Sequence, residues 1–206
     1  MQITKKLANY KNFNNIADIL LNETKLCVKD KEYQLCEIEF YYCDETDHHD
    51  DLTHCDDDQL NFGCFYFHKF KTGTYKAGTF KGLDMTFGDR DKKIYFGILI
   101  RSMRDFKDDK FIEGPCNCVN KILEQFNCKT VAEFMEHRNS PLNLFDETQQ
   151  IYLSEDNGLL RSELLRGPRV GLPGRHDYSM ALYRYTTNYG YSRIKKQKKF
   201  VPLKKN

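Results

Sequence analysis

Hydrophobic and polar positions alternate along residues 36–41, and this period of two predicts a β-strand. One face of the strand carries apolar residues, namely Cys36, Ile38 and Phe40. The other face carries two carboxylates and a phenol, namely Glu37, Glu39 and Tyr41. The strand therefore places carboxylates beside an aromatic ring, and it runs directly into residues 43–58, which are rich in aspartate and histidine.

The remaining patterns predict further strands and a few helices. Apolar residues spaced three and four apart over residues 3–22 indicate an amphipathic helix. Residues 26–28 and 33–42 form a predicted hairpin, and more strands are expected at 64–67, 79–87, 93–103 and 150–153. A helix should begin at Gly114-Pro115, and the capping-box spacing of Thr130 and Glu133 predicts a short helix reaching about residue 138.

These elements predict a mixed α/β (α+β) fold with a curved, mostly antiparallel sheet flanked by helices. The chain has 206 residues, of which 40% are hydrophobic, so it is long enough for one well-buried core and short for two. We expect a single domain over residues 1–194, followed by a frayed, basic C-terminal tail over residues 195–206. We also expect a monomer.

Charge is distributed unevenly along the chain, although the formal net charge is only +2. Residues 44–58 contain eight acidic residues and no Lys or Arg, whereas residues 161–206 contain twelve Lys or Arg against Glu163 and Asp177. The C-terminal quarter can therefore face a polyanion such as nucleic acid.

The eight cysteines do not follow the pattern of a small secreted disulfide protein, since several occupy apolar strand positions and the N-terminus has no signal-like run. We expect reduced thiols in an intracellular compartment, nuclear or cytoplasmic. No run approaches the 18 apolar residues that a membrane span needs, so we expect no membrane partner.

Residues 43–58 admit three interpretations. They can form a solvated acidic loop, which is the usual fate of a charge run. His48, His49 and His54 with several aspartates can supply metal ligands, although their spacing is unspecific. Alternatively, Glu39 acts as a general base on a rigid strand, with Tyr41 and His54 as walls of a pocket for a planar substrate.

Several motifs, taken in order, resemble the alkyladenine (3-methyladenine) DNA glycosylase family. The matching segments are Glu37-Ile38-Glu39-Phe40-Tyr41, Asp50-Asp51-Leu52-Thr53-His54, Gly97 to Arg101, Gly114-Pro115, Arg169-Val170-Gly171-Leu172 and the pair Arg184-Tyr185. They span roughly residues 25–185 in the family's order. The resemblance implies an enzyme of base-excision repair that flips a damaged purine out of duplex DNA and hydrolyses its glycosidic bond.

The resemblance also implies roles for individual residues. Glu39 would activate the water, and Arg101 would hold Glu39 and that water. The flipped base would be bound by four side chains, namely Tyr41, His54, His68 and Asp84. No lysine nucleophile, cofactor or metal is required, so a monofunctional enzyme is expected.

Two departures from the family pattern concern substrate and DNA binding. The family inserts a tyrosine into the duplex where this chain has Ala77, with Tyr75 and Lys76 just before it. The family's base-discriminating asparagine is replaced by Asp84, which accepts hydrogen bonds but donates only when protonated. A further set of residues is expected to face DNA, namely Tyr75, Lys76, Ala77, Lys81 and Arg169. The departures also leave open a nucleic-acid or nucleotide-binding protein of the same fold that does not excise bases.

Overall fold

The computed structural model describes residues 6–7, 12–138, 140–156, 158–159, 161–172, 177–195 and 200–203. Its helices are α2 (Phe13–Asn22), α3 (Pro115–Gln125), α4 (Val131–Met135) and α5 (Asn188–Arg193), with 3-10 turns η1 (Asp57–Leu60), η2 (Gly78–Phe80) and η3 (Glu147–Gln149). Its strands are β1 (Thr24–Val28), β2 (Lys31–Cys43), β3 (Phe62–Phe67), β4 (Leu83–Phe87), β5 (Tyr95–Asp105), β6 (Phe111–Glu113), β7 (Leu142–Asn143), β8 (Ile151–Glu155), β9 (Leu164–Gly167), β10 (Arg184–Thr187) and β11 (Val201–Pro202).

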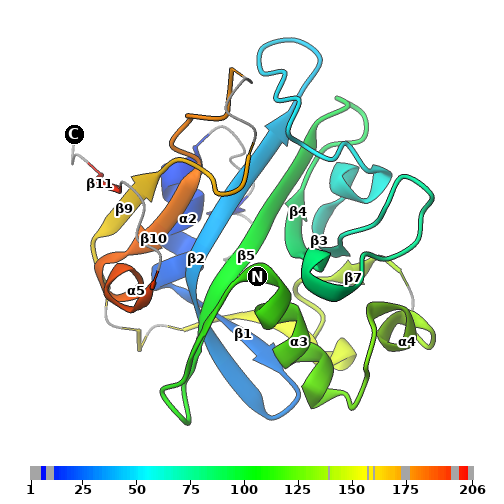
Figure 1. Cartoon of the computed structure of the whole chain (residues 1–206), viewed down its shortest axis with the longest axis vertical. Helices are drawn as coiled ribbons and strands as arrows, with labels where there is room; N and C mark the ends of the chain where they lie inside the picture. The colour runs from blue at the N-terminus through cyan, green and yellow to red at the C-terminus, as the bar shows by residue number, and fades with distance from the viewer. Residues whose placement is uncertain are drawn as a thin grey trace.

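The strands form one open sheet in the order β11-β9-β10-β2-β5-β4-β3-β7, and every strand pairing among the described residues is antiparallel. Strands β1, β6 and β8 pair off this path. Figure 1 shows β2 and β5 running through the middle of the molecule, with α2 and α3 nearby. The expected mixed α/β fold with a mostly antiparallel sheet and few helices is therefore confirmed.

The central strand β2 follows the predicted alternation. Ile38 and Phe40 lie on its apolar face within the core, together with Ile98 and Ile100 of the neighbouring strand β5. Helix α2 covers this face, and the Phe13 ring stacks on Phe40 with centroids 4.7 Å apart. Burial of these apolar side chains removes them from water and fixes the register of β2, because a one-residue slip would exchange its two faces.

Two irregularities interrupt the pairing of β2 with β5. Leu35 pairs with Met103 and Glu37 with Ser102, which leaves Cys36 as an extra residue of β2. Ile38 then pairs with Ile100, which leaves Arg101 as an extra residue of β5. Because bulges redirect side chains, this second irregularity allows Arg101 to reach the carboxylate face of β2.

Several predicted boundaries are corrected by the structure. Residues 78–80 form the 3-10 turn η2 rather than the start of a strand, and β4 begins at Leu83. Helix α4 ends at Met135; its Thr130 cap is present, but Glu133 accepts from the Lys129 N–H, which gives only half of the expected capping box.

The C-terminal segment departs from the expected frayed tail in the part that the structure describes. Val201 and Pro202 form β11, which pairs with Arg166 and Leu165 of β9. Residues 196–199 and 204–206 of the predicted basic tail lie outside the described residues, as does most of the N-terminal part of the predicted helix over residues 3–22. Within the described part of the chain, no helix is long and apolar enough to cross a membrane.

Candidate active site

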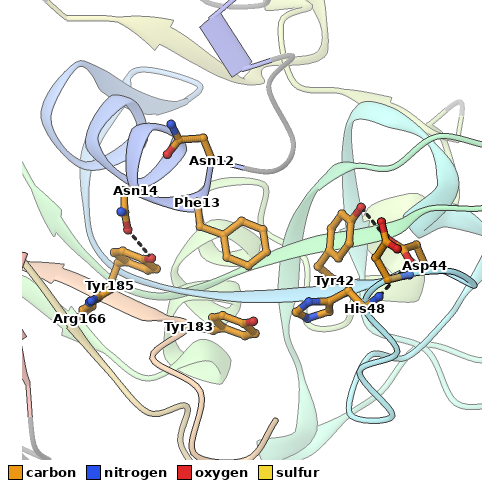
Figure 2. A pocket seen from close by; sticks show the side chains of 10 residues that line it. Asn12, Phe13, Asn14, Tyr42, Asp44, His48, Arg166, Tyr183 and Tyr185 are labelled. Carbon is orange, nitrogen blue, oxygen red and sulfur yellow. Dashed lines mark hydrogen bonds between the residues drawn. The ribbon is translucent and has the colours of Figure 1, made fainter.

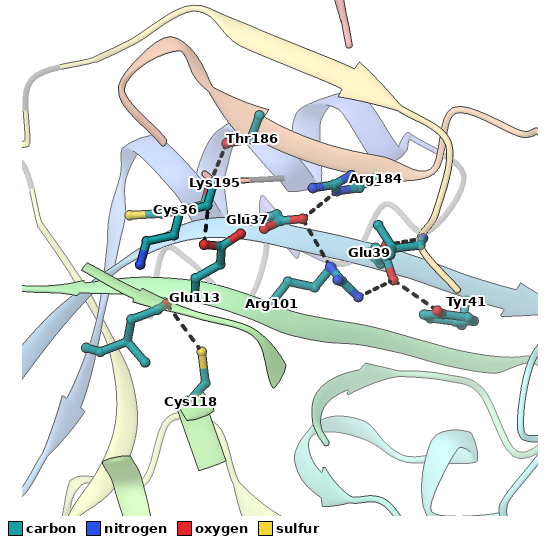
Figure 3. A network of polar contacts seen from close by, with 12 residues as sticks. Cys36, Glu37, Glu39, Tyr41, Arg101, Glu113, Cys118, Arg184, Thr186 and Lys195 are labelled. Atoms are coloured by element: carbon teal, nitrogen blue, oxygen red, sulfur yellow. Dashed lines mark hydrogen bonds and ion pairs between the residues drawn. The ribbon is translucent and has the colours of Figure 1, made fainter. Parts of the chain in front are cut away.

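Two carboxylates and two guanidinium groups meet on the polar face of β2 (Figure 3). Glu37 Oε1 accepts from Arg101 Nε at 3.0 Å and also from Arg184 Nε. Glu39 Oε2 accepts a hydrogen bond from Arg101 Nη1 at 3.2 Å. Arg101 therefore bridges the two glutamates, and the pairing of opposite charges compensates the cost of burying them.

Glu39 is completely buried, with 0% of its surface exposed. Besides Arg101, it accepts from the Tyr41 hydroxyl at 3.0 Å on Oε2 and from the Val170 N–H at 2.7 Å on Oε1. A carboxylate offers about four acceptor positions. Three are occupied by these donors, so one remains on Oε1.

Burial raises the pKa of Glu39 above its ordinary value of 4.5, although Arg101 and the Val170 N–H act in the opposite direction. A carboxylate with a raised pKa is a stronger base than a solvated one. For Arg101, burial acts to lower the pKa, but Glu39 and Glu37 outweigh it and raise the pKa overall. The guanidinium therefore stays charged beside Glu39.

The segment 169–172 closes the site from a part of the chain distant in sequence. Arg169 is 3% exposed; its guanidinium donates to Asp50 at 2.7 and 3.1 Å and lies 4.6 Å from the centre of the Tyr41 ring. This buried pair holds Val170 against Glu39. Arg169 was expected to face DNA, and that expectation is corrected: its charge is enclosed by Asp50 and cannot contact a phosphate.

A small pocket of about 110 Å³ is connected to Glu39 through Tyr41, which lines the pocket and donates its hydroxyl to Glu39; Glu39 itself is not part of the lining. Its lining includes all four residues expected to bind the substrate, namely Tyr41, His54, His68 and Asp84, together with Leu52, Gln59 and Leu172. These residues come from five separate segments of the chain. Their convergence brings the four residues together in one pocket, of which Tyr41 also contacts Glu39.

Asp84 is bound on both carboxylate oxygens inside this pocket. His68 Nε2 lies 2.7 Å from Oδ1, and Gln59 Nε2 donates to Oδ2 at 3.3 Å. Gly97 makes this possible, because a Cβ there would come within 2.5 Å of Asp84 Oδ2 and 2.6 Å of Gln59 Nε2. Asp84 is therefore a buried acceptor, and both of its polar partners, His68 and Gln59, also line the pocket.

His54 lies at the exposed rim of the pocket, where its ring meets His68 edge to face at 4.5 Å. Partial burial, followed by the neighbouring His68, lowers the pKa of His54 to about 4. The ring is therefore neutral at pH 7. Lys76, which was expected to face DNA, lies with Nζ 3.2 Å from His54 Nε2, at the same rim.

The loop between β3 and β4 carries the other residues expected to face DNA. Ala77 is exposed and Lys81 is half-buried, whereas Tyr75 packs partly against the core and under Lys69. Phe80, which the sequence motifs did not single out, is 71% exposed on η2. The exposed aromatic side chains of this loop are therefore Phe80 and, at 48%, Phe70, rather than Tyr75.

The aspartate-rich residues 43–58 include both exposed and buried side chains, and the sequence did not distinguish the two groups. Asp44 and Asp50 are buried, the first accepting three backbone N–H groups of its own loop and the second pairing with Arg169. Across the described residues, no group of three or more His, Cys, Asp or Glu side chains is arranged to hold a metal ion. The buried part of this loop therefore has a structural role, in which Asp44 holds the loop backbone and Asp50 holds Arg169.

Other residues of the site were missed by the motifs. Glu37 and Arg184 occur in the motifs without an assigned role. Gln59 carried no signal, because a lone glutamine before an aromatic strand is common. The Val170 N–H is a main-chain group, so no side-chain pattern can identify it. These groups become recognisable only through their contacts with Glu39 and Asp84.

No family model matches this chain. An uncharacterized protein of Acanthamoeba polyphaga mimivirus is 42% identical to it over 198 residues, which cover 90% of this chain and 89% of the viral protein.

Proposed function

We propose that this chain, which belongs to the same family as the mimivirus protein, is a monofunctional DNA N-glycosylase that excises a damaged or modified purine by hydrolysis. One observation carries the proposal. A completely buried glutamate, held by an arginine and a main-chain N–H, is bonded to Tyr41, which lines a pocket together with His54, His68 and Asp84. A general base beside a base-sized aromatic and polar pocket is what hydrolysis of an N-glycosidic bond requires.

In this mechanism, the acceptor position remaining on Glu39 Oε1 orients a water molecule toward the sugar C1′. Glu39 takes a proton from that water as the water oxygen bonds to C1′ and the bond from C1′ to the base nitrogen breaks. The electron pair of that bond leaves with the base. The carboxylate also stabilises the positive charge that develops on the sugar.

Arg101 has a positioning role in the proposed reaction. Its guanidinium contacts Glu39 and Glu37 at once, so it keeps the Glu39 carboxylate in one orientation on a strand of the sheet. Tyr41 links the two halves of the site, because its hydroxyl contacts Glu39 while its ring lines the pocket. A rigid base aligned with a stacked substrate reduces the orientational cost of the reaction.

The pocket favours a neutral purine over a cationic one. The His54 ring is neutral at pH 7 and can stack on the flipped base. The acidic side chain of the pocket, Asp84, is already engaged on both oxygens by His68 and Gln59, so it offers little compensation to a cationic base. Hypoxanthine and ethenoadenine therefore fit the proposal better than 3-methyladenine.

The β3–β4 loop is the proposed DNA-facing surface. It presents Phe80, with Lys76 and Lys81 on either side of the turn, and it continues directly into His68 at the pocket. Apolar side chains such as phenylalanine act as wedges between base steps in proteins that distort the duplex, and lysines contact the adjoining phosphates. Phe80 is thus proposed to occupy the space that an extruded base leaves.

The test is a single-turnover assay on duplex oligonucleotides that contain hypoxanthine, ethenoadenine or 3-methyladenine, with abasic product revealed by alkaline cleavage. Glu39→Gln should lower the excision rate by about 10²- to 10⁴-fold, because it removes the base without changing the shape of the side chain. Glu32→Gln, an exposed glutamate at the start of the same strand, is the matched control and should retain the wild-type rate. Phe80→Ala should weaken binding to the lesion duplex more than it slows excision at saturation.

Absence of abasic product from all three substrates at saturating protein would refute the excision proposal. A second function, a nucleic-acid-binding module without excision, is favoured by one observation: Ala77 stands where the resembled family has its intercalating tyrosine. In that case, binding should show a steep salt dependence and Glu39→Gln should leave the affinity unchanged.

A further inference from the structure

A second cavity, of about 390 Å³, lies on the opposite face of β2 from Glu39. Tyr42 of β2 lines it, whereas its neighbours in the alternation, Tyr41 and Glu39, point to the first site. The cavity opens between the first turn of α2, the loop that follows β2, and the segment leading into β10 (Figure 2). Its volume is within the range of pockets that bind small molecules, about 300–1,000 Å³.

Aromatic rings form the middle of this cavity. Tyr183 and His48 lie side by side with centroids 5.6 Å apart and planes inclined by 35°, and the Phe13 ring stands edge-on to Tyr183 at 5.1 Å. Tyr42 meets His48 edge-on at 5.3 Å. Burial lowers the pKa of His48, so its ring is neutral at pH 7. These rings, with Tyr178 packed on His48 at 4.3 Å, give the cavity an uncharged aromatic lining against which a planar group can pack.

One end of the cavity is cationic. Arg166 of β9 lies there beside Tyr185 of β10, its partner across the strand pair. The Tyr185 hydroxyl donates to Asn14 Oδ1 at 2.8 Å, which fixes both groups at this end (Figure 2). The half-buried Arg166 is suited to a phosphate, because a guanidinium offers several donors in a plane.

The other end of the cavity is acidic. Asp44 and Asp47 lie there, and the Tyr42 hydroxyl donates to Asp44 Oδ2 at 3.0 Å. Asp44 Oδ1 accepts the backbone N–H groups of Thr46, Asp47 and His48, which shapes the loop. Bonding to these N–H groups outweighs burial and lowers the pKa of Asp44, so it remains ionised. This end therefore contributes negative charge to the cavity, with the Asp44 oxygens largely engaged by Tyr42 and the loop itself.

Two buried nitrogens in the lining lack a hydrogen-bond partner among the described residues, namely His48 Nε2 and Arg166 Nε. Buried polar atoms are nearly always bonded in folded proteins, so an unpaired one calls for an explanation. Here the two nitrogens come from the aromatic lining and from the cationic end. Both atoms are enclosed by protein, so a ligand in the open cavity contacts the other atoms of these two side chains.

We propose that this cavity is a nucleotide site. The base stacks on Tyr183 and His48 against Phe13, its amino edge faces Asp44 and Asp47, and its phosphate binds Arg166. A cavity with aromatic and acidic side chains can also bind an organic cation, but the positive charge of Arg166 disfavours such a ligand. A free mononucleotide and an unstacked nucleotide of a single strand share this chemistry. The site is separate from the Glu39 pocket and does not rest on the excision proposal.

Isothermal titration calorimetry on the full chain tests the assignment with AMP, GMP, CMP, UMP and adenosine as probes. Arg166→Gln should weaken binding of the mononucleotides about tenfold or more and leave adenosine unchanged, because adenosine has no phosphate. Tyr183→Leu should weaken both, because the stacking surface is lost. Lys129→Gln, an exposed cation elsewhere on the surface, is the matched control and should change nothing. Glu39→Gln should also leave AMP binding intact.

Three outcomes would overturn the assignment: no binding of any mononucleotide at millimolar concentration, binding that Arg166→Gln and Tyr183→Leu both leave unchanged, or tighter binding of tetramethylammonium than of AMP. If Tyr183→Leu does not fold, the contrast between AMP and adenosine in Arg166→Gln still decides the question. Competition between AMP and a single-stranded oligomer of about ten nucleotides distinguishes the two sources of the ligand. Tighter binding of the oligomer at the same site identifies a strand, and tighter binding of AMP identifies a free nucleotide.

Discussion

The two faces of strand β2 carry two polar sites that are built in opposite ways. On one face, Glu37 and Glu39 are buried and both are paired with Arg101. On the other face, Tyr42 borders an open cavity in which buried nitrogens of His48 and Arg166 lack partners within the described structure. Neighbouring residues of a single strand thus serve one closed and one open site.

The difference separates what each site can do. The ion pairs among Glu37, Glu39 and Arg101 hold these side chains in one geometry, as a general base requires, but they leave little room for a ligand. A cavity lined by aromatic rings and a half-buried arginine has room for a ligand that stacks and carries negative charge. The closed face is therefore suited to chemistry, and the open face is suited to binding.

The largest expected difference between the two faces is in the free energy of unfolding when the arginine of each face is replaced by methionine. Arg101→Met leaves Glu37 with only Arg184 and Glu39 with no cation, so the free energy of unfolding should fall by about 3–5 kcal/mol. Arg166→Met should change it by less than about 1 kcal/mol, because the open site loses no paired charge. Urea unfolding of both variants measures the contrast. Equal losses would show that the two faces are not built differently.

A smaller effect is expected from Gly97→Ala. The added Cβ would lie 2.5 Å from Asp84 Oδ2 and 2.6 Å from Gln59 Nε2, so the pocket must deform at a cost of about 1–3 kcal/mol. Excision should be lost while AMP binding on the opposite face persists. The excision assay and AMP titration of Gly97→Ala, each compared with the wild type, test this prediction. Loss of both together would mean that the faces do not function independently.

The smallest effect concerns pH. The pKa of Glu39 is raised in the folded protein, so its contribution to stability is complete below the unfolded value of 4.5 and is lost as pH rises through the folded pKa. Relative to Glu39→Gln, which does not titrate, the wild type should lose stability as the pH rises above the unfolded value, for example from pH 5 to pH 8. Urea unfolding at both pH values measures the difference. A relative gain for the wild type over that interval would mean that Arg101 and Val170 outweigh burial.

The raised pKa of Glu39 also determines the direction in which the excision rate changes with pH. Protonated Glu39 cannot accept a proton from water, so the excision rate should fall on acidification through the raised pKa, about tenfold per pH unit below it. The carboxylate face thus loses activity in acid although it gains stability there. The opposite face contains Asp44, whose lowered pKa keeps it ionised in the same range.

Much of the fold could be predicted because its signals are local. The hairpin of β1 and β2, the strand β5 and the helix that begins at Pro115 follow from periodicity and from turn or cap residues close in sequence. The errors occurred where local signals compete. Residues 78–80 have strand-like composition but turn as η2, and Val201 with Pro202 joins the sheet although the flanking lysines predict a tail.

The sequence by itself determined that Glu39 and Tyr41 share one face of β2 and that Phe40 and Tyr42 share the other, because side-chain direction in a strand depends only on the alternating backbone. Only the tertiary structure decided that Val170, 131 residues away, donates to Glu39 and that Arg169 turns inward to Asp50. The local sequence around a basic residue such as Arg169 does not show whether its side chain lies on the surface or in the core. Its role is settled by which carboxylate the fold brings within hydrogen-bond distance.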